Sequence, residues 1–147
     1  MKRILFIAII LASILQINAS AQNKSEQRKK WMLEMTNAKI EFMNNELEIK
    51  NGQKEEFKQI YNAYLAELNK IHRETRALQK SIDEKEKASD LEYEKAAEAM
   101  FEMKSKEGKV NEKYFSMFQK LLTPYQLFKF HKAEARWKKN LMKHRKK

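Results

Sequence analysis

Apolar residues recur along most of the chain at intervals of three and four, which is the period of a helix with one apolar face. One such series is Phe57, Ile60, Tyr64, Ile71, Leu78 and Ile82. No stretch alternates with period two, so we expect no strands. Only two glycines and one proline interrupt the chain. The pattern therefore predicts an all-α fold of long helices with few corners.

Breaks in this pattern divide the chain into about four predicted helices. The first covers residues 25–48 and ends before the turn signal at Asn51-Gly52. The second begins near Gln53, and its apolar face suits packing along a neighbouring helix, as in a coiled coil. The charged stretch 83–90 lacks large apolar residues. We expect a bend or loop there.

The third helix is predicted to start at Ser89 or Asp90, because either side chain can cap it. It continues through Gly108, where glycine costs up to about 1 kcal/mol relative to alanine. We interpret Gly108 as a weak point or a site of close contact, and not as a helix end. The fourth helix opens at Thr123.

The start of the fourth helix is the most specific local signal in the sequence. The Thr123 hydroxyl can accept from the amide of Gln126, and the Gln126 side chain can reach back to the amide of Thr123. Together they form a capping box. Pro124 falls at the first helical position, where a missing amide costs nothing. Leu122 and Leu127 flank the box and can close as a hydrophobic staple.

A degenerate copy of this motif precedes the second helix. Residues 49–53 align with residues 122–126 so that the apolar residue and the glutamine coincide, while Lys50 replaces the threonine. Phe57 then falls opposite Phe130. We interpret the two segments as two copies of one helix start.

The N-terminus has the three parts of a secretory signal peptide. A positive segment at residues 1–3 precedes an apolar run at residues 4–15, and Ala19-Ser20-Ala21 supplies small residues for cleavage. A membrane anchor is the alternative, but the run is shorter than the roughly 20 residues that a span needs. We therefore predict a signal peptide over residues 1–21, cleaved near Ala21, and one helical domain over residues 22–147.

The cysteine content and the net charge limit the kinds of site and partner that we expect for an exported protein of this sequence. The absence of cysteine excludes disulfides, thiolate metal sites and thiol nucleophiles. A formal net charge of +11 would suggest nucleic acid for a cytosolic protein. Outside the cytoplasm, the expected anions are instead lipid head groups, lipopolysaccharide phosphates and acidic patches on other proteins. We expect no nucleic-acid partner.

With its signal peptide, helices and paired motifs, the chain resembles the Spy/CpxP group of small exported helical proteins. The group is marked by two Leu-Thr-x-x-Gln motifs. The second is present in full as Leu122-Thr123-x-x-Gln126, whereas the first keeps only Ile49 and Gln53. The resemblance implies a cradle-like fold of about four helices in long hairpins, assembled as an antiparallel homodimer in the bacterial periplasm.

The same resemblance implies a function. Spy-like members are ATP-independent chaperones that bind unfolded proteins on a concave, basic and partly apolar surface. Other members damp envelope-stress signalling by docking on a membrane sensor protein, and some bind metal ions. A signalling accessory and a metal-responsive sensor therefore remain alternatives to the chaperone-like function.

No catalytic or metal motif is assembled in the sequence. It lacks Gly-x-Ser-x-Gly, a phosphate-binding glycine loop and His-Glu-x-x-His, so we expect neither an enzyme nor a cofactor. Met32-x-x-Met35 and Met100-x-x-Met103 place paired thioethers on a helix face, which suits Cu(I). We interpret these pairs as apolar packing, and predict no metal site. The histidines lack helical pair spacing; they are His72, His131 and His144.

A basic, aromatic-rich surface is the best functional candidate. Flexible methionines adapt one surface to many partners, and nearby cations steer acidic or unfolded clients. The predicted client-binding residues are Trp31, Met35, Phe42, Met100, Met103, Lys138 and Lys139. The alternative is that the aromatic residues form the core and the dimer interface. The basic cluster at residues 138–147 either frays as a solvated tail or contacts anionic lipid.

Overall fold

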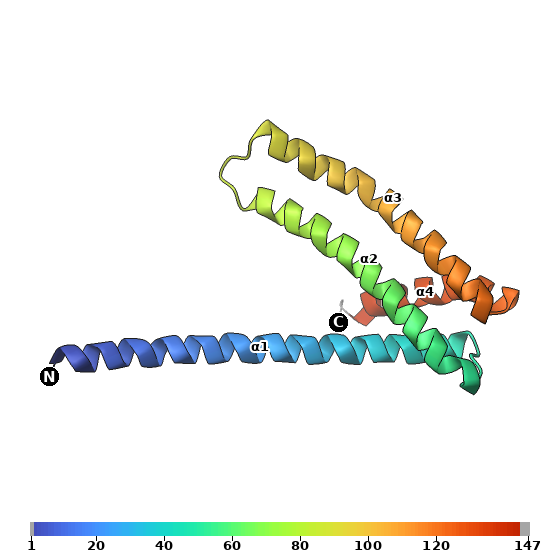
Figure 1. Ribbon diagram of the computed structural model, residues 1–147, viewed down its shortest axis with the longest axis horizontal. Coiled ribbons are helices and arrows are strands. Elements are labelled where there is room, and N and C mark those ends of the chain that lie inside the picture. Colours follow the sequence, from blue (N-terminus) through green and yellow to red (C-terminus); the bar gives the residue numbers. More distant parts are fainter. Residues whose placement is uncertain (1, 145–147) are drawn as a thin grey trace. The chain divides into compact units, whose positions relative to one another are not determined.

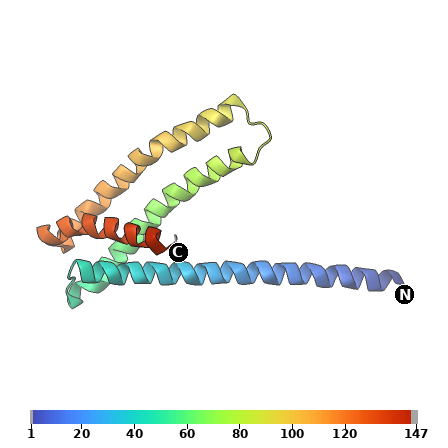
Figure 2. The ribbon, with the colours of Figure 1, turned by 180° about the vertical axis from the view of Figure 1, so that it is seen from behind.

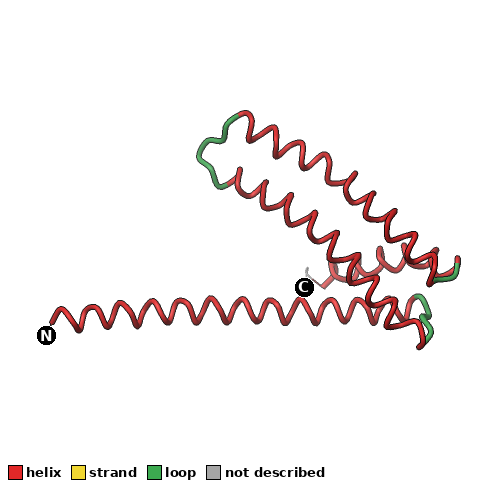
Figure 3. The backbone as a smooth tube through the Cα atoms, in the orientation of Figure 1, coloured by secondary structure: helices red, strands yellow, loops and turns green. Residues whose placement is uncertain are grey.

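The computed structural model of the chain describes residues 2–144, with side chains described from Asn23 to Lys143. Within residues 2–144 it contains four α-helices, one short 3-10 helix and no strand (Figure 1, Figure 3). The predicted all-α class is confirmed. The elements are α1 Lys2–Glu46, η1 Asn51–Gln53, α2 Lys54–Asp83, α3 Asp90–Leu121 and α4 Pro124–His144.

The chain divides into two compact units. The first is Met1–Phe42, and the second is Met43–Lys147, which takes in the end of α1 together with α2, α3 and α4. Helix α1 begins well before the predicted start at Ser25, and neither glycine nor proline occurs within it to break it. The side chains of residues 1–22 lie outside those described. The signal peptide at residues 1–21 therefore stays a prediction.

Helix α1 ends in a Schellman turn at Glu48. The amide of Ile49 donates to the carbonyl of Asn44 at 2.9 Å, and the amide of Glu48 donates to that of Asn45 at 3.2 Å. Glu48 is left-handed, with φ of 54°. Glycine usually fills this position, and a side chain there costs roughly 1–2 kcal/mol. The turn that terminates α1 thus has a strained backbone at Glu48, two residues after the last helical residue, Glu46.

Helices α2 and α3 lie side by side and run in opposite directions (Figure 1, Figure 2). Residues 84–89 connect them, within the charged stretch where the sequence predicts a loop. Ser89 caps α3, as predicted, and the Glu92 carboxylate accepts from its backbone amide at 2.9 Å. Gly108 lies inside α3, and a Cβ added there would meet nothing within 4 Å. Of the two interpretations of Gly108, close contact is therefore wrong within the described chain.

An aromatic cluster forms the core where α2, α3 and α4 meet. Phe57 of α2 and Phe130 of α4 follow the two motifs at equivalent positions, and both contact Phe118 of α3. Their ring centroids lie 5.9 and 4.8 Å from that of Phe118. Tyr61 is buried beside them, edge-on to Phe130, and its hydroxyl donates to the Glu134 carboxylate. The repeat in the sequence therefore converges on one cluster.

Candidate functional site

The motif at the start of α4 forms a complete capping box. The amide of Thr123 donates to Oε1 of Gln126 at 2.9 Å, and the amide of Gln126 donates to Oγ1 of Thr123 at 3.2 Å. Gln126 is only 8% exposed, and its Nε2 donates to the carbonyl of Leu47 at 3.0 Å. Leu122 is buried, and Pro124 is the first residue of the helix. These contacts cap the start of α4 and join it to the residues that follow α1.

The degenerate first motif serves the same architecture by another contact. Lys50 makes no side-chain cap, and the chain enters α2 through the 3-10 turn η1. Ile49 is buried. Gln53 donates from Nε2 to the carbonyl of Leu121, at the end of α3, at 2.8 Å. Both glutamines are therefore committed to backbone carbonyls and are not free to contact a client.

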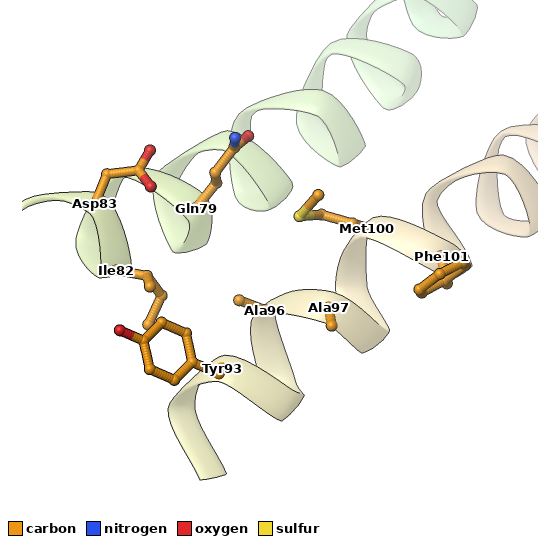
Figure 4. A pocket seen from close by; sticks show the side chains of 8 residues that line it. All are labelled: Gln79, Ile82, Asp83, Tyr93, Ala96, Ala97, Met100 and Phe101. Carbon is orange, nitrogen blue, oxygen red and sulfur yellow. The ribbon is translucent and has the colours of Figure 1, made fainter. Parts of the chain in front are cut away.

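An apolar groove, here called the distal groove, lies between the end of α2 and the start of α3 (Figure 4). Its volume is about 540 Å³. Ile82 of α2 lines it together with Tyr93, Met100 and Phe101 of α3. Phe101 is 86% exposed. Such a side chain offers almost its whole apolar area to a partner.

At the distal groove the buried positions carry small side chains, while large apolar side chains are exposed. Ala96 of α3 and Ala88 of the connection are buried, and alanine fills little of the space between the helices. Tyr93 and Met100 then remain about half exposed, at 52% and 47%. Figure 4 shows Met100 extending between the two helices above Ala96. Large apolar side chains of α3 are therefore available at the surface of this groove.

A second groove, here called the proximal groove, lies among α2, α3 and α4, with a volume of about 730 Å³. Its apolar lining comprises Tyr64, Leu68, Tyr114, Phe115, Phe118, Leu127 and Phe130. Glu107, Glu112, His131 and Lys138 are among its polar residues. Apolar walls with a few polar groups suit an apolar segment that carries its own charges.

The surroundings of Glu107 and Tyr64, which both line the proximal groove, shift the pKa values of these two side chains. Hydrogen bonds from Lys104 and His72 lower the pKa of Glu107, which keeps that carboxylate charged. Burial, with Glu134 nearby, raises the pKa of Tyr64 to about 12. Its hydroxyl stays protonated and donates to Oδ1 of Asn111 at 2.9 Å. This geometry provides hydrogen-bond partners and no activated nucleophile.

The predicted client-binding residues do not gather at one place in the second unit. Met100 lines the distal groove, and Lys138 lines the proximal one. Met103 is half-buried on α3, and Lys139 is exposed on α4. The remaining three lie on α1 in the first unit; they are Trp31, Met35 and Phe42. The last residues of the basic cluster, 145–147, lie outside the described residues.

Sequence reasoning missed the exposed aromatic residues next to the predicted stripe. Phe101 and Phe115 each lie one position off the apolar series of α3 that includes Met100 and Tyr114. One residue turns the side chain by about 100° around a helix. This position is not by itself a signal of exposure, because Phe118 lies one position off Met117 in the same series and is buried.

The described side chains do not assemble a metal site or a membrane-spanning helix. Between residues 23 and 143, no group of three or more histidine, aspartate or glutamate side chains could hold a metal ion. In that same part of the chain, no helix has both the length and the apolar character needed to cross a bilayer.

Comparison with known protein families, curated proteins and solved structures found no match to the chain.

Proposed function

We propose that this protein is a chaperone-like binding protein that captures apolar segments of unfolded proteins without ATP and without catalysis. The observation that carries the proposal is Phe101, which is 86% exposed beside an apolar groove of about 540 Å³. An exposed apolar cluster of this kind is typical of an interaction surface. The resemblance to the Spy/CpxP group supports the same function.

Capture would be weak and tolerant of sequence. Burial of apolar area contributes roughly 25 cal/mol per Å² and requires no particular side-chain pattern in the client. Met100 and Tyr93 border Phe101 in the groove, and a flexible methionine adapts to different client side chains. After the predicted cleavage removes Lys2 and Arg3, the net charge falls from +11 to +9, which attracts acidic clients over long range and keeps the complex soluble.

The resemblance also supports a location and an assembly. We propose export to the periplasm with removal of residues 1–21, and a cradle-like homodimer built from hairpins of the long helices. Unfolded or envelope proteins would be the partners in that compartment. The distal groove would then contribute one apolar surface from each copy.

Suppression of aggregation tests the function. Equimolar protein should reduce light scattering by several unrelated denatured clients without ATP, and high salt should slow capture because exposed charges are screened. The double variant Met100→Ser/Phe101→Ser should lose most of this suppression. Phe128→Ser on α4 is the matched control, because Phe128 is also largely exposed, at 62%, and lines neither groove. No suppression with any client would overturn the proposal.

The two alternatives predict different results. A signalling accessory would bind one membrane sensor saturably and would hardly affect generic clients, which a pull-down from envelope extract can reveal. A metal-responsive sensor would bind Zn²⁺, Cu⁺, Ni²⁺ or Co²⁺ with better than micromolar affinity in calorimetry. Either result, together with inactivity toward clients, would replace the chaperone-like function.

A further inference from the structure

We propose that the outward face of α4 docks on an anionic phospholipid surface. This outward face consists of Phe128, Lys132, Ala135, Lys139 and Met142, which recur at intervals of four and three along the helix. All five are exposed. That spacing places them in one stripe along α4. The proposal is separate from client capture, because the stripe lines neither groove.

The stripe is exposed to solvent because α4 packs against the rest of the second unit through its opposite face. Gln126 and Ala133 are buried, and Phe130, Glu134 and Trp137 are half-buried. Phe130 belongs to the aromatic cluster, and Glu134 accepts from Tyr61. Packing within the second unit therefore uses the side of α4 opposite the stripe. The other side is left to solvent.

Charge on α4 is strongly one-sided. Glu134 is its only carboxylate, and it points to the packed side through its contact with Tyr61. Two cations are neutralised within the unit: Lys129 pairs with Glu48 and Arg136 pairs with Glu46. On the outward face, neither Lys132 nor Lys139 has an ion pair among the described side chains. These cations remain available to an external anion.

Apolar side chains alternate with these cations. Phe128 is 62% exposed and Met142 is 56% exposed, one near each end of the stripe. The Lys132 ammonium lies 4.3 Å above the centre of the Phe128 ring, so the cation and the ring share one surface. An ammonium at head-group depth with an aromatic ring beneath it is the arrangement of an interfacial helix.

The shape of this surface favours a lipid surface over a protein or a nucleic acid. The stripe is a straight line of side chains on a helix, and it lies outside both grooves. A fluid bilayer can adapt its head groups to such a line and accept shallow insertion of Phe128 and Met142.

A site-specific probe tests the docking on the full chain. The protein contains no cysteine, so Ala135→Cys can carry a single environment-sensitive fluorophore on the outward face. Its emission should shift to the blue with phosphatidylglycerol-containing vesicles and much less with pure phosphatidylcholine. Ser105→Cys, at an exposed position on α3, is the matched control and should not shift. Equal shifts at both positions, or equal shifts with both lipids, would overturn the proposal.

Charge variants supply the second measurement. Lys132→Gln/Lys139→Gln should weaken partitioning into phosphatidylglycerol vesicles roughly thirtyfold, because each cation near an anionic membrane surface contributes a factor of roughly five to the partition constant. Lys54→Gln/Lys58→Gln removes the same charge from exposed positions on α2 and should have little effect. Circular dichroism should show unchanged melting for both variants. Equal losses of partitioning in the two double variants would indicate attraction by net charge alone and would overturn the proposed docking site. Binding only to an acidic protein or a nucleic acid, and not to the vesicles, would also overturn it.

Discussion

Gln53 and Gln126 each donate a side-chain hydrogen bond to a backbone carbonyl at the other's corner. Nε2 of Gln53 reaches the carbonyl of Leu121, directly before the second motif, at 2.8 Å. Nε2 of Gln126 reaches the carbonyls of Leu47 and Glu48, directly before the first motif, at 3.0 and 3.4 Å. The last carbonyls of a helix lack partners within it. Each glutamine side chain therefore donates to a carbonyl at the end of another helix, where no backbone amide of that helix is available.

Replacement of Gln126 should cost more stability than replacement of Gln53. Gln126→Ala removes one side of the capping box and leaves the Leu47 carbonyl buried without its donor, so we expect a loss of about 2–3 kcal/mol. Gln53 is only half-buried, so Gln53→Ala should cost about 1 kcal/mol. Urea denaturation measures both, with Thr123→Ala, also at about 1 kcal/mol, as the reference for the cap alone. The reverse order would contradict the cross-corner role of Gln126.

Strain at Glu48 should be relieved by glycine. Glu48 has a left-handed backbone and pairs with Lys129 through its carboxylate at 2.6 Å. Glu48→Ala removes the ion pair and keeps the strain, whereas Glu48→Gly removes both. The glycine variant should therefore be about 1 kcal/mol more stable than the alanine variant in denaturant unfolding. Equal stabilities would mean that the turn changes its backbone when the carboxylate is lost.

Alanine at position 108 should stabilise α3. Gly108 lies in a helix interior with open space around its Cα. Gly108→Ala should raise the free energy of unfolding by up to about 1 kcal/mol, because the helical backbone loses less entropy on folding. Thermal melting checks this, with Ser105→Ala, one turn away, as a control for helix propensity. Destabilisation would instead indicate that another surface approaches Gly108 in solution.

Acid should weaken the start of α3 through Glu92. Hydrogen bonds from Lys85 and from Ser89 hold the pKa of Glu92 at about 2, below its ordinary value of 4.5. A lowered folded pKa means that the charged carboxylate stabilises the fold above the ordinary value and loses this contribution as pH falls toward 2. Glu92→Gln should therefore lower Tm at neutral pH, and this difference should shrink between pH 4.5 and 2.

The neighbouring carboxylate provides the control for that measurement. Glu94 is exposed in the same turn region of α3. Glu94→Gln changes the net charge equally, so it should leave both Tm and its pH dependence nearly unchanged. A difference between Glu92→Gln and the unmodified chain that stays constant with pH would contradict the role assigned to the Glu92 charge.

Local patterns determined the helices of the second unit almost completely. The period of the apolar residues predicts α2, α3 and α4, and the box of Thr123 and Gln126 predicts the start of α4 at Pro124. The loop after Asp83 and the cap at Ser89 are likewise found where the sequence predicts them. These features are readable because the interacting groups lie within about one helical turn of each other.

Contacts between distant residues decided the rest. The bond from Gln53 to Leu121 joins residues 68 positions apart, so no local pattern announces it. Phe101 is exposed, whereas Phe118 of the same helix is buried because rings of α2 and α4 pack against it. The apolar stripe shows which residues can be buried in a helix. Only the neighbouring helices determine which of them are covered, because burial depends on the size and position of side chains from elsewhere in the chain.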